Sequence, residues 1–130
     1  MKYLLDTHTA LWLFEGNANL PQHARDIIFD AGNQIYISIA SAWEVAIKVS
    51  LSKLDLDGGV EIFLAKIAEN HINLLGVRGK YLEVVERLPL IHRDPFDRMI
   101  VATAKTEQLT LITIDENIQK YDIPWMWGKP

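Results

Sequence analysis

The 130-residue chain contains no cysteine, so it forms neither disulfide bonds nor thiolate metal sites. Any metal must therefore be bound by oxygen or by imidazole nitrogen. No uninterrupted apolar run is long enough to span a bilayer. The first residues, Met1–Asp6, meet a charge too early for a secretory signal. These absences predict a cytoplasmic protein without a membrane partner.

An excess of positive charge is also lacking. Lysine and arginine number 13 against 17 aspartate and glutamate residues, and the net charge is −4. This balance excludes a protein that coats nucleic acid through bulk positive charge. It does not exclude an enzyme that acts on nucleic acid, because a cation held among carboxylates reverses the local charge.

Short apolar runs alternate with longer helical patterns along the whole chain, without repeats or linkers. Runs that are apolar on both faces are typical of parallel strands covered by helices. Strands are predicted at Lys2–Asp6, Gln34–Ser38, Ile72–Leu75 and Leu109–Thr113, with a possible edge strand over residues 123–127. Helices are predicted at Thr7–Phe14, Pro21–Ala31, Ser41–Leu51, Val60–Glu69, Tyr81–Leu88 and Pro95–Glu107. The pattern indicates one α/β domain over residues 1–130 with right-handed crossovers.

Four acids fall where a predicted strand ends or a predicted helix begins. Asp6 closes the first strand, and Asp115 lies two residues beyond the strand that ends at Thr113. Glu44 and Asp97 lie in the first turns of two helices. Ligands of open α/β sheets bind at the carboxyl ends of the strands. We therefore expect the four carboxylates to share one edge of the sheet.

Helix capping explains most of these acids when each is taken alone. Ser41 and Glu44 match a capping box with Ser41 as the N-cap. Asp94 is the expected N-cap of the helix that opens at Pro95, and Asp115 is placed to cap a short helix after it. A carboxylate at the end of the apolar first strand is harder to explain in this way.

The conjunction of the four acids favours a metal site. Gathered at one sheet edge they repel one another, and such a cluster persists most readily around a cation. Oxygen ligands without thiols suit Mg²⁺ or Mn²⁺ better than Zn²⁺. Two such ions about 4 Å apart activate water and stabilise the leaving oxygen of a phosphodiester. Phosphodiester hydrolysis is therefore the chemistry that this set predicts.

Four segments of the chain resemble the PIN-domain proteins, and more narrowly the VapC toxins of bacterial toxin–antitoxin pairs. Each carries one of the four acids, in the family's order and spacing. The segments are Tyr3–His8, Ser41–Lys48, His92–Ala102 and Leu111–Asp115.

The resemblance implies a three-layer α/β/α sandwich with a mainly parallel sheet, often dimeric, that cleaves RNA with Mg²⁺ or Mn²⁺. It also implies a cognate antitoxin protein that inserts a peptide near the acidic site. The family's acids carry over to Asp6, Glu44, Asp97 and Asp115. Accessory positions are Thr113, whose hydroxyl supports the site, Thr7, and Asp94, for which we favour the N-cap role. The RNA target stays open.

Charged residues near the acids have two interpretations each. His8 contacts a substrate phosphate or is a polar residue of the first helical turn. His92, next to Arg93, forms a positive patch beside the acids or lies in a solvated loop, and we favour the loop. Lys48 forms an i,i+4 pair with Glu44 of roughly 0.3 kcal/mol, or it binds RNA. Arg98, next to Asp97, has the same two interpretations as Lys48, an ion pair with a nearby acid or a contact with a substrate phosphate.

The four tryptophans are interpreted by position. Trp12 and Trp43 lie on helical stretches, where we favour the core or a dimer interface over stacking on unpaired bases. Trp125 and Trp127 face opposite ways if their segment is extended, which leaves at least one exposed or covered by a partner.

Three rival functions remain to be weighed. A phosphate-receiving domain or an aspartyl-phosphatase also places acids at strand ends, but the phosphatase needs a second aspartate where this chain has His8. A receiver domain has an acidic pair near the end of its first strand and a lysine after its last core strand, and this chain has neither at the expected place. A non-cutting PIN-like interaction module has no reason to keep four repelling acids. A housekeeping RNA-processing nuclease stays open beside the toxin.

Overall fold

The computed structural model describes residues 1–129, and its centre is a five-stranded sheet that is parallel throughout. The strands follow the order β3-β2-β1-β4-β5. Their bounds are β1 Lys2–Leu5, β2 Gln34–Ser38, β3 Asn73–Leu75, β4 Thr110–Ile112 and β5 Trp125–Met126. The chain builds outward from β1 in one direction and then returns to its other side, so the strand order reverses between β1 and β4. This is the position at which open α/β sheets bind ligands.

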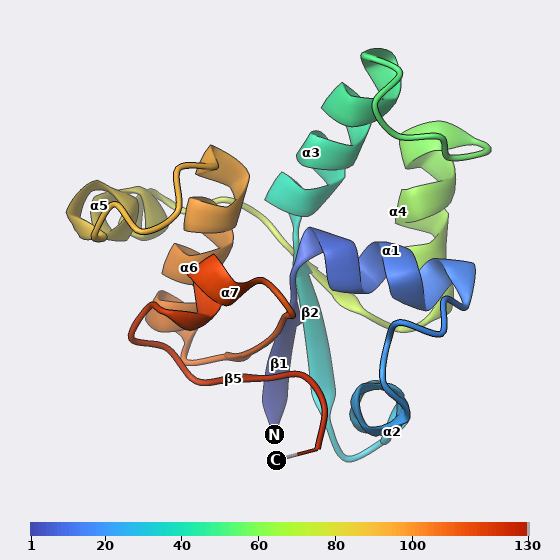
Figure 1. Cartoon of the computed structure of the whole chain (residues 1–130), viewed down its shortest axis with the longest axis horizontal. Helices are drawn as coiled ribbons and strands as arrows, with labels where there is room; N and C mark the ends of the chain where they lie inside the picture. The colour runs from blue at the N-terminus through green and yellow to red at the C-terminus, as the bar shows by residue number, and fades with distance from the viewer. Residues whose placement is uncertain (130) are drawn as a thin grey trace.

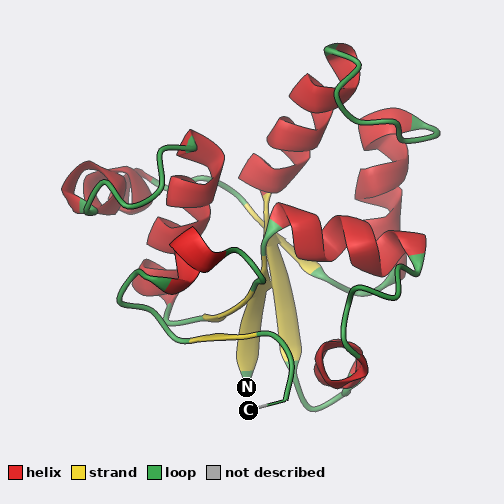
Figure 2. Cartoon of the chain, viewed as in Figure 1, coloured by secondary structure: helices red, strands yellow, loops and turns green. Residues whose placement is uncertain are grey.

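Helices cover both faces of the sheet, which makes a three-layer sandwich (Figures 1 and 2). One layer holds the first four helices, and the other holds the last three. Their bounds are α1 Thr7–Glu15, α2 Gln22–Phe29, α3 Ile39–Ser50, α4 Gly59–Glu69, α5 Gly79–Arg87, α6 Pro95–Glu107 and α7 Glu116–Gln119. None of the helices formed by residues 1–129 combines the length and apolarity that crossing a membrane requires.

Successive strand residues bury their side chains in two separate cores. Leu5 and Ile37 pack on the side of α1 to α4, whereas Leu4 and Leu111 pack on the side of α5 and α6. All four are fully buried. Apolar side chains on both faces are what a parallel sheet between two helical layers requires. The predicted α/β/α architecture is therefore confirmed, with most element ends within two or three residues of the prediction.

The predicted capping box at Ser41 is wrong. Helix α3 begins at Ile39, directly after β2, and its N-cap is Ser38, whose Oγ accepts the backbone N–H of Ala40 at 3.0 Å. Ser41 instead lies inside the helix, buried against Thr7. Glu44 consequently lies in the second helical turn, not in the first. Both serines are competent caps, and the absence of any loop between strand and helix selects the earlier one.

Candidate metal centre

A cleft of about 310 Å³ opens at the carboxyl ends of β1 and β4, beside the amino ends of α1 and α6. All four predicted acids line it, although they come from four separate parts of the chain. Its lining residues are Asp6, Thr7, His8, Leu11, Glu44, Lys48, His92, Asp94, Asp97, Ile114 and Asp115. The expected gathering of the carboxylates at one sheet edge is thus what the structure shows.

Asp6 is the most deeply buried of the acids, with 3% of its surface exposed. It caps α1 by accepting the backbone N–H of Thr9 on Oδ1 at 2.8 Å. Its Oδ2 accepts a hydrogen bond from the Thr113 hydroxyl. Burial raises the pKa of the Asp6 carboxyl, and the hydrogen bonds from Thr113 and Thr9 only partly offset this effect.

Glu44 reaches the cleft from α3 and is 5% exposed. Its Oε1 accepts the Thr7 hydroxyl at 2.7 Å, and its Oε2 lies 2.7 Å from the Lys48 ammonium. The predicted i,i+4 pair is therefore present. The hydrogen bond to Glu44 raises the pKa of Lys48. Because half of the Lys48 side chain is exposed, this pair orients the carboxylate more than it stabilises the fold.

Asp97 and Asp115 approach each other across the ring of His92. The His92 Nε2 lies 3.0 Å from Asp97 Oδ2 and 3.1 Å from Asp115 Oδ2. One ligand atom from each of the three residues lies within 4.8 Å of the others. Burial raises the pKa of Asp97 to about 7, with further contributions from the charges of Asp94 and Glu44.

Asp115 and Asp94 are confirmed as helix caps. Asp115 Oδ1 accepts the backbone N–H groups of Asn117 and Ile118 at 2.8 and 3.0 Å, which leaves its Oδ2 facing His92. Asp94 Oδ1 accepts the N–H groups of Phe96 and Asp97 at 2.8 and 3.1 Å. Asp94 and Asp115 thus each cap a helix and also line the cleft.

The interpretation of Arg98 as a phosphate contact is wrong. Arg98 is 9% exposed and extends away from the cleft toward the end of α5. Its guanidinium donates to the carbonyls of Val85 and Pro89 at 2.8 and 2.9 Å and to the Tyr121 hydroxyl at 3.2 Å. Carbonyls at the end of a helix carry partial negative charge, so they replace a carboxylate partner.

The tryptophans divide between core and surface. Trp12 is half-buried, and its ring packs against those of His8 and Trp127 at centroid distances of 4.4 and 5.8 Å. Trp43 is 62% exposed, so its placement in the core of this chain is wrong. Its ring meets Phe96 edge-on at 5.1 Å. Trp125 is also exposed, as expected for one of the two C-terminal tryptophans.

The prediction of a solvated loop at His92 is wrong, because the structure places the ring between Asp97 and Asp115. A histidine two residues before an N-cap is within reach of the helix amino terminus, and that spacing was the available signal. The contact with Asp115 has no local signal, because that residue arrives 23 positions later.

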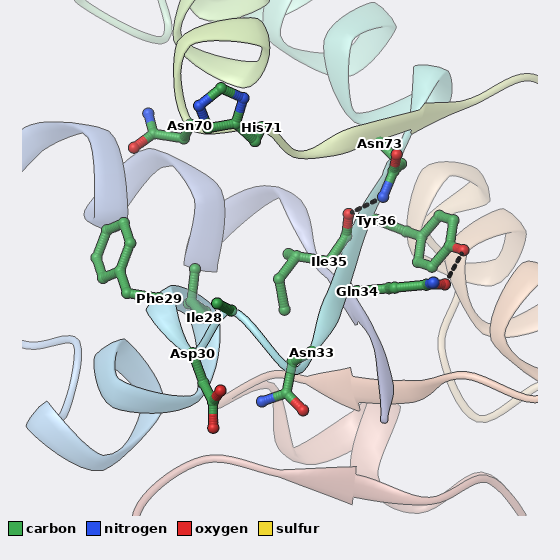
Figure 3. Close-up of a pocket in the computed structure, with 11 residues that line it drawn as sticks. Ile28, Phe29, Asp30, Asn33, Gln34, Ile35, Tyr36, Asn70, His71 and Asn73 are labelled. Carbon is green, nitrogen blue, oxygen red and sulfur yellow. Dashed lines mark hydrogen bonds between the residues drawn. The ribbon is translucent and has the colours of Figure 1, made fainter.

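A second pocket, of about 600 Å³, lies at the other end of the sheet, where β2 and β3 begin (Figure 3). Several of its polar groups are engaged with their own neighbours. Asn73 donates to the Ile35 carbonyl at 3.0 Å, and Tyr36 donates to Gln34 at 2.8 Å. The pocket is larger than the acidic cleft, but it does not gather ionisable groups in the way that the cleft does.

The residues of the acidic cleft suit a divalent cation. Asp6 and Glu44 each keep unused lone pairs, because each carboxylate oxygen accepts more than one hydrogen bond or metal bond. Asp97 and Asp115 present one oxygen each to the cleft side of His92. The pKa of Asp97 is raised in part by neighbouring carboxylates, and a cation offsets this repulsion. A hard oxygen donor set of this kind fits Mg²⁺ or Mn²⁺.

Comparison with known proteins identifies the family. The profile of the PIN domain matches residues 3–124. The chain belongs to the PIN-domain family. Ribonuclease VapC22 of Mycobacterium tuberculosis is 28% identical to this PIN domain over 122 residues, which are 93% of this chain and 92% of that protein.

Two solved structures share the fold of this PIN domain over nearly its whole length. VapBC2 from Rickettsia felis, bound to a DNA fragment from its promoter, gives a TM-score of 0.72 at 18% identity and covers 98% of this chain and 99% of the matched chain. VapBC-1 from nontypeable Haemophilus influenzae gives a TM-score of 0.68 at 16% identity, with 97% of each chain covered. The likeness establishes the three-layer fold independently of the sequence motifs.

Proposed function

We propose that this PIN domain is a metal-dependent endoribonuclease that hydrolyses RNA phosphodiester bonds. One observation carries the proposal. Carboxylates from the β1–α1 junction, α3, α6 and the β4–α7 connection converge on a single cleft at the reversal of strand order. A cluster of buried, mutually repelling acids costs stability, and its retention is explained by the binding of a cation that serves catalysis.

In this proposal Asp6, Glu44, Asp97 and Asp115 are the catalytic metal ligands for Mg²⁺ or Mn²⁺. Thr7 and Thr113 orient Glu44 and Asp6 through their hydroxyl groups. A divalent ion bound there supplies a Lewis acid for the developing charge of the phosphodiester. Asp94 serves as an accessory acid that raises the negative potential of the cleft while it caps α6.

We further propose that the enzyme is the toxin of a toxin–antitoxin pair. The relative from M. tuberculosis is named a ribonuclease, and the R. felis and H. influenzae structures are VapBC assemblies. A solved toxin–antitoxin complex from Klebsiella pneumoniae shares the fold at a TM-score of 0.65. We accordingly propose one domain that acts in the cytoplasm as a homodimer, cuts RNA, and is inhibited by a cognate antitoxin protein.

The decisive experiment is incubation of the purified protein with total RNA and Mg²⁺, with and without EDTA. RNA fragments are expected only in the absence of EDTA, and Asp97→Asn should abolish them. Asp122→Asn is the matched control, because this acid is exposed and does not line the cleft. Cleavage that persists in EDTA would contradict the metal mechanism. An absence of cleavage for every RNA tested would favour a non-cutting interaction module.

A further inference from the structure

The ring of His92 is fixed in one tautomer by its hydrogen bonds. Its Nδ1 accepts the backbone N–H of Asp94 at 3.1 Å, so this nitrogen carries no proton. The single ring proton of the neutral side chain therefore lies on Nε2, the nitrogen that faces the acids. A metal ligand needs a free lone pair, and the lone pair of His92 is already used on the side away from the cleft.

The Nε2 proton lies between the two carboxylates. It is donated to Asp115 Oδ2 at 3.1 Å, and Asp97 Oδ2 lies 3.0 Å from the same nitrogen. The positive edge of the ring thus attracts two oxygens that repel each other. Only 15% of the His92 side chain is exposed, so little water competes for this position.

The backbone of His92 is held as firmly as its ring. Its N–H donates to the Tyr121 hydroxyl at 2.9 Å, and this hydroxyl donates to the Pro89 carbonyl at 2.9 Å. The buried Arg98 guanidinium donates to the same hydroxyl at 3.2 Å and to the same carbonyl at 2.9 Å. A loop anchored at both ends delivers the ring to one place, which a flexible loop could not do.

We propose that His92 is a positioning residue, which presets the spacing of Asp97 and Asp115 by hydrogen-bond donation and does not itself bind the metal. The inference rests on the proposed metal site. Outer partners of this kind orient metal ligands, and their loss typically weakens metal affinity by about 10- to 100-fold.

The tautomer is tested by a proton–nitrogen correlation spectrum of the histidine rings, with His92→Gln used to assign the signal. In the metal-free protein we expect His92 to carry its proton on Nε2. With saturating Mg²⁺ the proton should stay there, because a donor keeps its proton and a ligand loses it. A proton on Nδ1, or loss of the Nε2 proton on addition of Mg²⁺, would overturn the proposal.

Metal affinity supplies the second readout, measured by calorimetric titration with Mn²⁺. His92→Ala should bind Mn²⁺ about 10-fold more weakly or worse, and His92→Gln should recover part of the loss because its amide still donates. His23→Ala is the control, because this half-buried histidine lies on α2 outside the cleft. Unchanged affinity in His92→Ala would refute the positioning role.

The two proposals fail in different ways. If the wild-type protein binds neither Mn²⁺ nor Mg²⁺, the metal site of the proposed function is wrong, and the positioning of ligands falls with it. If the metal binds with full affinity in every His92 variant, the metal site stands and the role of His92 is wrong. Should His92→Ala fail to fold, the ring spectrum of the wild type and the titration of His92→Gln still decide.

Discussion

The Thr113 hydroxyl connects Asp6 to Asp115. It donates to the Asp6 carboxylate and accepts the backbone N–H of Asp115 at 3.0 Å. Thr113 itself is fully buried at the end of β4. One small side chain therefore fixes the relative position of two acids that lie more than one hundred residues apart in the sequence.

Thr113→Val tests this connection while it preserves the shape of the side chain. The variant leaves an acid oxygen and a backbone N–H without their partner, so the free energy of unfolding should fall by about 1–3 kcal/mol in urea titrations. Thr113→Ser should restore most of the loss. Thr106→Val is the control, because the Thr106 hydroxyl is buried without a hydrogen-bond partner and its replacement should cost nothing. Equal effects at the two positions would contradict the connection.

Two substitutions at Asp6 separate its charge from its capping role. Burial raises the pKa of Asp6, so its charge destabilises the metal-free fold. Asp6→Asn keeps an oxygen for the Thr9 N–H and should leave the melting temperature in EDTA unchanged or higher. Asp6→Ala removes the cap and should cost about 1 kcal/mol. If asparagine proves as destabilising as alanine, the buried charge of Asp6 does not destabilise the metal-free fold.

The metal-free protein should lose stability as the pH rises from about 4 to about 7. Burial raises the pKa of Asp97 from 3.8 to about 7. Between these values the native state holds a proton that the unfolded chain releases, so deprotonation favours unfolding. The slope for one proton is at most about 1.4 kcal/mol per pH unit. The loss is complete above the native pKa.

Urea titrations in EDTA at pH 5, 6, 7 and 8 measure this dependence. Asp97→Asn cannot release the proton, so its unfolding free energy should vary less with pH than that of the wild type. A wild-type protein that gains stability over this interval relative to the variant would show that the native pKa of Asp97 is not raised.

Arg98 should stabilise the fold, although it lies beside a catalytic candidate. Arg98→Met removes the donors for the Val85 and Pro89 carbonyls and for the Tyr121 hydroxyl, and should cost more than about 2 kcal/mol. Arg93→Met is the matched control, because Arg93 is exposed on the adjoining loop and its loss should change stability by less than about 0.5 kcal/mol. Thermal melts of the two variants measure the difference, and equal melting temperatures would contradict the structural role of Arg98.

The sequence predicted the features whose signals are local. The cap at Asp94 is predicted from Pro95 at the first helical position, and the cap at Asp115 from the short helical pattern that follows it; both caps are present. The parallel sheet is predicted from short runs such as Lys2–Asp6, whose central residues are apolar on both faces. The shared location of the four acids is predicted because the carboxyl ends of parallel strands lie at one edge of the sheet.

Features that depend on tertiary packing were not predictable. The orientation of Arg98 depends on how α5 packs on α6, and a single helix gives no sign of that. The start of α3 was misplaced because Ser38 and Ser41 are equally good caps, and only the direct passage from β2 chooses between them. His92 was undervalued because one of its partners, Asp115, follows a helix and a further strand.

Asp6 and Asp115 each use Oδ1 to hold a helix amino terminus, while Oδ2 faces another side chain of the site, Thr113 for Asp6 and His92 for Asp115. At these two positions the same side chain therefore serves both helix capping and the candidate metal site. Under the proposed function, a descendant that no longer bound a metal in the cleft would still be selected for a capping side chain, so substitution by asparagine or serine should precede substitution by an aliphatic residue. Relatives that have lost metal binding should therefore be recognisable by amides in place of these acids in a fold that is otherwise unchanged.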